Sequence, residues 1–144
     1  MLRLNTLQNV MSKNVISVSS NQSIEEAASL MSQHNIGAIP VVDNGALQGI
    51  ITDRDITLRS TAKGKGDQTP VSQVMSRDIV SGNSSMSMEE AAQLMSDKQI
   101  RRLPVVDNNN LVGMVALGDL STSKASDESA GHALSNISEQ NHTS

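Results

Sequence analysis

The stretch VMSKNVISVSSNQSIEEAASLMSQHNIGAIPVVDNGALQGIITDRDI, residues 10–56, decides the fold because the chain repeats it. Moved along by about 64 residues, it aligns without a gap with residues 74–120, and about 22 of 47 positions are identical. Ordinary composition would give about three matches by chance. Two copies of so long a period predict two structural units of one kind rather than a solenoid of small repeats. We expect them to pack as a closed pair with a pseudo-twofold axis.

Each copy shows the pattern of a strand, a helix, two strands and a second helix. The first helix is predicted to start after Ser23, with Glu26 in the capping-box position, and to end near residues 34–37. Its apolar residues recur at spacings of three and four, so that one face packs against a core. In the second copy Ser87 takes the capping position.

Short runs rich in β-branched residues predict the strands, and Asp43-Asn44-Gly45 and Asn108-Asn109 predict tight hairpin turns, since these residues accept positive φ angles. The second helix of the first copy is predicted over residues 53–62. The expected fold class is therefore α+β, with two β-α-β-β-α repeats. The predicted strands are 15–18, 38–42 and 47–52 in the first copy and 79–81, 103–106 and 111–116 in the second.

The predicted organisation has four parts. Repeat 1 spans 7–62, a linker 63–70, repeat 2 71–122, and a polar tail 123–144 in which residues 126–137 could form one amphipathic helix. The polar, glycine-containing linker predicts a flexible, solvent-exposed connection. Thr69-Pro70 predicts a short helical lead into Val74-Met75.

The composition excludes several classes of protein. The 144 residues contain no cysteine and no aromatic residue, which excludes disulfides, thiolate metal sites and an aromatic platform for single-stranded nucleic acid. The formal charge of −4 argues against nucleic-acid binding.

No apolar run approaches the roughly 20 residues of a membrane helix, and the start lacks the apolar stretch of a signal peptide, so we expect a cytoplasmic protein. Met31, Met75, Met95 and Met114 are expected in the core, because eight methionines stand in for the missing aromatic residues.

The sequence shows no set of residues with the spacing of a catalytic site. The acidic pairs Glu25-Glu26 and Glu89-Glu90 stand at helix starts, where they favour the helix dipole. His34, His132 and His142 do not converge at metal-ligand spacing, so no metal site is predicted. We therefore expect no enzyme activity.

The motifs VMS, EEA, PVVD and G-x-x-T-x-x-D resemble those of CBS domains, and the tandem resembles a Bateman module of the free-standing, small bacterial type, over about residues 7–120. This resemblance implies a non-catalytic regulatory module, with no obligatory cofactor, that binds an adenosine-type ligand in the clefts between the repeats. AMP, ADP, ATP and S-adenosylmethionine are the candidates. It also implies a homodimer that signals to an unknown protein partner.

The family motif falls on Gly49, Ile50, Ile51, Thr52 and Asp55, and the resemblance implies that Thr52 and Asp55 hold the ribose. A carboxylate can accept from both ribose hydroxyls, and the helix start favours an anion, for which Arg54 is a further candidate contact. In the family each cleft also takes groups from the opposite repeat, among them Arg101 and Arg102, whose forked donors suit phosphate. The first predicted cleft thus comprises Thr52, Arg54, Asp55, Ile79, Val80, Ser81, Arg101, Arg102 and Pro104.

The second predicted cleft departs from the motif, because Ala116 stands where the hydroxyl should be and the facing residues include no base. We expect one competent cleft and one degenerate cleft. The second comprises Ile16, Ser17, Val18, Ala38, Ile39, Pro40, Ala116 and Asp119.

Thr52, Arg101 and Arg102 also have purely structural interpretations. Thr52 is also a suitable helix cap, and Arg101 and Arg102 are compatible with a plain exposed pair. The alternative function is a ligand-free scaffold for dimerisation or protein–protein interaction, which the Ala116 departure favours. A nucleic-acid or stress-response binder is a third alternative, which the negative charge and the missing aromatic residues oppose.

Overall fold

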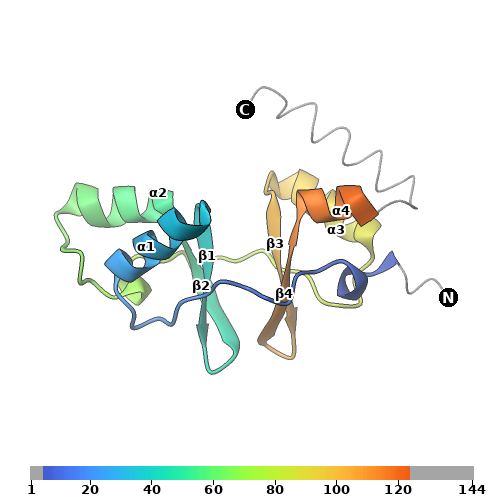
Figure 1. Ribbon diagram of the computed structural model, residues 1–144, viewed down its shortest axis with the longest axis horizontal. Helices are drawn as coiled ribbons and strands as arrows, with labels where there is room; N and C mark the ends of the chain where they lie inside the picture. The colour runs from blue at the N-terminus through green and yellow to red at the C-terminus, as the bar shows by residue number, and fades with distance from the viewer. Residues whose placement is uncertain (1–4, 124–144) are drawn as a thin grey trace. The chain divides into compact units, whose positions relative to one another are not determined.

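The computed structural model describes residues 5–123 (Figure 1) and divides the chain into two compact units. Unit 2 consists of Ile16–Ile79 with Asn109–Leu111. Unit 1 consists of Val80–Asn108 with the described parts of Met1–Val15 and Val112–Ser144. The elements follow one another as helix, strand, strand and helix in each repeat, and this mixture of helices and strands confirms the predicted α+β class. No helix within residues 5–123 has the length and apolar character needed to cross a membrane.

Two helices begin with the capping boxes expected from the sequence. In α1 (Ile24–His34) the Ser23 hydroxyl accepts from the Glu26 N–H, and the Glu26 carboxylate accepts from the Ser23 N–H. The start of α3 (Met88–Lys98) repeats this arrangement with Ser87 and Glu90. Each helix ends at a residue in the left-handed conformation, Asn35 or Gln99.

The hairpins also agree with the prediction. In unit 2, β1 (Ala38–Asp43) pairs antiparallel with β2 (Ala46–Thr52), and Asn44 and Gly45 turn the chain with φ of 52° and 85°. The second hairpin joins β3 (Arg102–Asp107) to β4 (Asn110–Ala116) through Asn108 and Asn109, with φ of 52° and 70°. Positive φ at both turn residues matches the twist of the strands.

The strands predicted at 15–18 and 79–81 are wrong as regular strands. In the first segment only Val18 forms a bridge, a parallel one with Val41, and in the second the parallel bridge to Val105 falls on Gly82, one residue beyond the predicted strand. The next bridge toward the N-terminus would need an N–H at Pro40 or at Pro104, which proline lacks. The prolines of the two PVVD motifs therefore limit the pairing.

The helix predicted over 53–62 is helical but not α-helical throughout. One α-helical turn, α2 (Asp53–Asp55), leads into a π-helical turn (Ile56–Ser60) and then a 3-10 turn (Thr61–Lys63). In unit 1 the corresponding helix is α4 (Leu117–Ser123). The predicted short helical lead into Val74 is confirmed as a 3-10 turn at Val71–Gln73, and a second such turn is Leu7–Asn9. The helix predicted at 126–137 lies outside the described residues.

The linker is solvent-exposed over residues 63–68, as predicted, but it is not without contacts. The Thr69 and Asp67 carbonyls accept from the Ile24 and Glu25 N–H groups at 2.9 and 3.1 Å. These N–H groups are among those that an α-helix leaves unpaired in its first turn. The linker thereby completes the start of α1.

The segment that opens each sequence repeat belongs to the compact unit of the other repeat. Ser76 exchanges two backbone hydrogen bonds with Ile50 of β2, at 2.8 and 2.9 Å, and Ser12 exchanges two with Met114 of β4, both at 2.9 Å. A glycine lies beneath each crossing. A Cβ on Gly49 would come within 2.6 Å of the Ser76 carbonyl oxygen, and a Cβ on Gly113 within 2.7 Å of the Met11 sulfur. The motif glycines therefore let the opening segments approach the strands.

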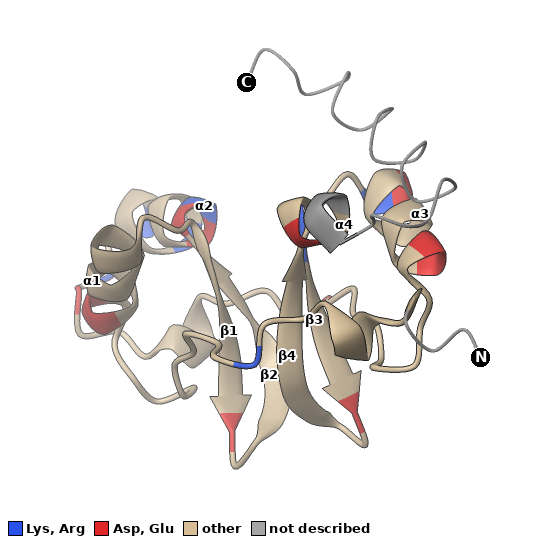
Figure 2. Ribbon diagram, turned by 45° about the vertical axis from the view of Figure 1, so that its right-hand side comes forward, with Lys and Arg blue, Asp and Glu red and all other residues tan. Residues whose placement is uncertain are grey.

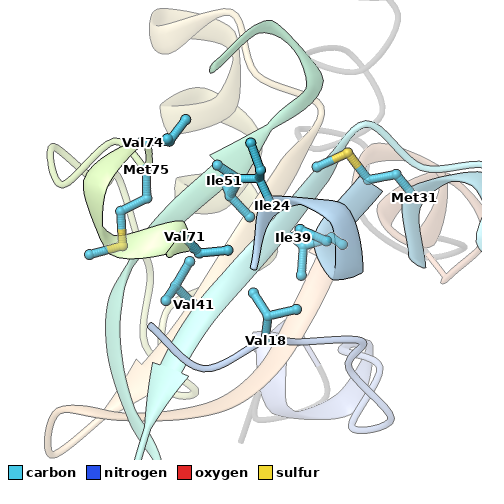
Figure 3. Packing of buried hydrophobic residues seen from close by; sticks show 10 residues of the cluster. Val18, Ile24, Met31, Ile39, Val41, Ile51, Val71, Val74 and Met75 are labelled. Atoms are coloured by element: carbon cyan, nitrogen blue, oxygen red, sulfur yellow. The ribbon is translucent and has the colours of Figure 1, made fainter. Parts of the chain in front are cut away.

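Each unit has its own apolar core of aliphatic residues and methionine. Figure 3 shows the core of unit 2, where the side chains of α1, β1, β2 and the Val71–Met75 segment converge. Met31, Met75, Met95 and Met114 are all buried, as expected for a chain without aromatic residues. The unit 2 core contains Val18, Ile24, Ala27, Met31, Ile39, Val41, Ile51, Val71, Val74 and Met75, and that of unit 1 contains Leu7, Met88, Ala91, Ala92, Met95, Leu103, Val105, Val115 and Leu120.

Candidate functional site

The start of α2 is organised by Thr52 and Asp55. The strand β2 ends at Thr52, which has extended backbone angles and caps the helix. The Asp55 N–H donates to Thr52 Oγ1 at 3.0 Å, and the Thr52 N–H donates to Asp55 Oδ2 at 3.1 Å. The capping role considered for Thr52 is thus present. The Thr52 hydroxyl still has its own proton to donate, so capping does not exhaust its hydrogen-bonding capacity.

Two further residues contact the carboxylate of Asp55, a residue that is only 8% exposed. The Ser76 hydroxyl lies 3.1 Å from Asp55 Oδ1 and 3.3 Å from Oδ2, and donates its proton to this pair of oxygens. The Arg59 Nε lies 3.8 Å from Oδ1. Arg59 Nη1 also donates to the Met75 and Val74 carbonyls, at 3.2 and 3.4 Å. The guanidinium therefore joins the helix of Asp55 to the segment that carries Ser76.

The sequence prediction missed Ser76 and Arg59. Arg59 follows Asp55 by four residues, the spacing at which two side chains meet on a helix, so a local signal existed. Ser76 lies 21 residues from Asp55 and reaches it only because the opening segment of repeat 2 lies in unit 2. No local pattern could have indicated that contact.

The carboxylate of Asp55 retains acceptor capacity. An ionised carboxylate offers about four lone-pair sites. The Thr52 N–H and the Ser76 hydroxyl supply two protons to them, and Arg59 lies beyond hydrogen-bond distance. These hydrogen bonds of the described residues therefore use about two of the four lone-pair sites of Asp55.

Other predicted residues lie near this helix start within unit 2. The Asp53 N–H donates to the Gly37 carbonyl at 3.0 Å, and Ala38 stands opposite Thr52 in the strand register. Arg54 is exposed on α2. Ile39 and Pro40 follow in β1 and are buried, and Val18 bonds to the strand on either side of Val41.

The corresponding start of α4 in unit 1 keeps half of the arrangement. The Ala116 N–H donates to Asp119 Oδ2 at 2.9 Å, which matches the bond from Thr52 to Asp55. Alanine has no hydroxyl to accept in return. The Leu117 N–H donates to the Arg101 carbonyl at 2.9 Å, so the exposed Arg101 and Arg102 stand beside this helix start within unit 1.

The two predicted clefts each draw on both units. Of the first, Thr52, Arg54, Asp55 and Ile79 lie in unit 2, whereas Val80, Ser81, Arg101, Arg102 and Pro104 lie in unit 1. Of the second, Ile16, Ser17, Val18, Ala38, Ile39 and Pro40 lie in unit 2, whereas Ala116 and Asp119 lie in unit 1. The grouping of these residues into clefts stays a prediction from the resemblance.

Many of the charged residues lie at the ends of helices and strands. Figure 2 shows acidic residues at the starts of α1 and α3 and at the ends of β1 and β3, and residues of both charges at α2. Those strand ends are Asp43 and Asp107. The Ser20 hydroxyl and then the Ser20 N–H hold the pKa of Asp43 below its usual value, and Ser84 does the same for the pKa of Asp107. These carboxylates serve the fold rather than the candidate site.

A model of the CBS domain matches residues 7–60 and 71–126, which is most of the chain. The chain belongs to the CBS domain family. It is 62% identical, over 96% of its length and 99% of the relative's, to the CBS domain-containing protein YhcV of Bacillus subtilis (strain 168).

The solved structures that are similar to this one include the following three. Hypoxic Response Protein I, solved with two coordinated zinc ions, has a TM-score of 0.74 at 31% identity and covers 82% of this chain and 98% of its own. The CBS domain pair of protein MJ0100, in complex with 5′-methylthioadenosine and S-adenosyl-L-methionine, has a TM-score of 0.68 at 33% identity over 83% of this chain and 95% of its own. CBSX2 in complex with AMP has a TM-score of 0.72 at 25% identity over 83% and 96%.

The first of these structures contains two coordinated zinc ions. Among residues 5–123 no three His, Asp or Glu side chains are grouped so as to hold a metal ion. His34, at the end of α1, is exposed. His132 and His142 lie outside the described residues.

Proposed function

We propose that this CBS protein is a non-catalytic sensor that binds an adenosine-type ligand through the start of α2. The observation that supports the proposal is the arrangement around Asp55, a nearly buried residue whose carboxylate uses about two of its four lone-pair sites in hydrogen bonds of the described residues. The related domain pair bound to 5′-methylthioadenosine and S-adenosyl-L-methionine, and the one bound to AMP, support the adenosine part of the ligand.

In this proposal Asp55 accepts from the ribose hydroxyls and Thr52 donates its hydroxyl proton. Arg54, exposed at the helix start, faces the solvent from which a phosphate would approach. On the family resemblance alone, Arg101 and Arg102 are proposed as further phosphate contacts, and Ile79, Val80, Ser81 and Pro104 as further ligand-binding residues. AMP, ADP, ATP and S-adenosylmethionine are the candidate ligands, and none is an obligatory cofactor.

The second site, at Ala116 and Asp119, is proposed to be weaker. Ala116 provides no hydroxyl, so a ligand there would lose one hydrogen bond that Thr52 offers. A missing hydrogen bond typically weakens binding by about 0.5–1.5 kcal/mol. Ligand occupancy is proposed to act through a cytoplasmic homodimer on a protein partner.

A ligand-free scaffold for dimerisation is the alternative that one observation favours. The capping box and Ser76 already give the Asp55 carboxylate a structural role, which explains its burial without any ligand.

The chain has no Phe, Tyr or Trp, so an adenine absorption band in the purified protein would come from a bound molecule. Mass analysis of an acid extract would identify it.

The two functions differ in their response to added nucleotide. A ligand that binds only the folded state raises the unfolding temperature. We expect AMP or S-adenosylmethionine to raise the Tm of protein that has been freed of bound ligand. A preparation with no adenine band and no Tm shift across these compounds would instead support the scaffold.

A further inference from the structure

The contact between Ser76 and Asp55 links the candidate site to a distant part of the sequence. We propose that Ser76 is a positioning residue that orients the Asp55 carboxylate for ribose, an inference that rests on the proposed function. Ser76 does not touch the ligand in this account. It acts through Asp55 alone.

The geometry supports an orienting role rather than a simple neighbour contact. The Ser76 oxygen lies nearly midway between the two carboxylate oxygens, at 3.1 and 3.3 Å, while the Thr52 N–H holds Oδ2 at 3.1 Å. Two donors at different directions fix the rotation of the carboxylate plane. Removing the Ser76 hydroxyl would leave the Thr52 N–H as the hydrogen-bond donor and Arg59 at the longer distance of 3.8 Å, so the carboxylate would be held less firmly. A binding group held in its productive orientation avoids the entropic cost of being ordered when the ligand arrives.

The Ser76 hydroxyl is itself held on a rigid support. Its backbone exchanges two hydrogen bonds with Ile50, and the preceding Met75 is 5% exposed within the unit 2 core. Gly49 permits this close crossing, since a Cβ there would lie 2.6 Å from the Ser76 carbonyl oxygen. Arg59 adds two bonds to the carbonyls of Val74 and Met75. The serine therefore has little freedom to move away from Asp55.

The chain offers a matched control at Ser12. Ser12 occupies the same place in repeat 1 that Ser76 occupies in repeat 2, and it makes the same backbone exchange, with Met114 of β4. It is exposed and lies in unit 1. A Ser12→Ala change removes the same atoms at a comparable crossing without altering the surroundings of Asp55.

The test is calorimetric titration of AMP into the wild type and into Ser76→Ala, Ser76→Thr, Ser12→Ala and Asp55→Ala, with the Tm of each recorded. We expect Ser76→Ala to weaken AMP binding by up to about tenfold, which corresponds to the cost of ordering one freed side chain when the ligand binds. Ser76→Thr keeps the hydroxyl and should bind within about twofold of wild type, and Ser12→Ala should bind as wild type.

Several outcomes would overturn the inference. One such outcome is that Ser76→Ala binds AMP with wild-type affinity, even if its Tm is lower, while Asp55→Ala loses AMP binding. The serine would then have only a structural role, and the proposed function would stand. If Ser76→Thr loses as much affinity as Ser76→Ala, the hydroxyl is not responsible. If the wild type binds neither AMP nor S-adenosylmethionine, the proposed function fails and this inference fails with it.

Discussion

At the scale of single residues, each repeat contains a carboxylate that ties a strand end to the loop before the first helix. Asp43 accepts from the Ser20 N–H at 2.9 Å and from its hydroxyl at 2.6 Å, and Asp107 accepts from the Ser84 N–H at 3.0 Å. Both carboxylates bind more strongly as anions, which is why their pKa values are lowered.

The lowered pKa of Asp43 predicts a pH-dependent stability. A carboxylate with a depressed pKa stabilises the folded state above its unfolded pKa, near 3.8, and loses that contribution as the pH falls through the folded pKa. We expect Asp43→Asn to have a lower Tm than wild type at neutral pH. The difference should shrink below the unfolded pKa, as measured by circular dichroism. A Tm difference that stays constant with pH would contradict this role.

Replacement of the buried Ser60 is expected to stabilise the folded protein. Ser60 is 1% exposed and its hydroxyl has no hydrogen-bond partner within residues 5–123, so folding removes that group from water without compensation from this part of the chain. We expect Ser60→Ala to raise the free energy of unfolding in urea by about 1 kcal/mol. Ser23→Ala is the matched control, because that buried hydroxyl caps α1, and its loss should cost about 1 kcal/mol. A destabilised Ser60→Ala would mean that the hydroxyl has a partner in solution.

At the scale of elements, the crossing of the opening segment over β2 depends on Gly49. Neither Gly49 nor Gly37 has a positive φ, so only space distinguishes an alanine at the two positions. At Gly49 the new Cβ meets a backbone oxygen at 2.6 Å, whereas at Gly37 it meets the exposed Asp53 carboxylate at 3.0 Å, which can turn aside. We expect Gly49→Ala to cost about 1–3 kcal/mol and Gly37→Ala clearly less, measured by urea unfolding. Equal losses would contradict the importance of the crossing.

Which elements could be predicted depended on the range of the interactions that form them. The starts of α1 and α3 and both hairpin turns follow from residues within a few positions of one another, and the sequence located them well. The opening segments read as strands by composition, but their pairing depends on Pro40 and Pro104 in another element. Nothing in Asp53–Ala62 indicated a π-helical turn.

At the scale of the whole molecule, the sequence revealed the two repeats but not how the chain is shared between the two compact units. The opening segment of each repeat lies in the unit of the other, an arrangement that no periodicity encodes. The same non-local contact brings Ser76 to Asp55. The motif was therefore sufficient to nominate Thr52 and Asp55, while the residues that hold Asp55 required the fold.

The central claim is that the start of α2, rather than the start of α4, binds the adenosine-type ligand. The most direct measurement is calorimetric titration of AMP into wild type, Asp55→Ala and Asp119→Ala, after confirming by circular dichroism that each is folded. The account predicts that Asp55→Ala abolishes binding and that Asp119→Ala changes the affinity by less than about threefold, since Ala116 has already weakened that site. Loss of binding in Asp119→Ala with unchanged affinity in Asp55→Ala would contradict it.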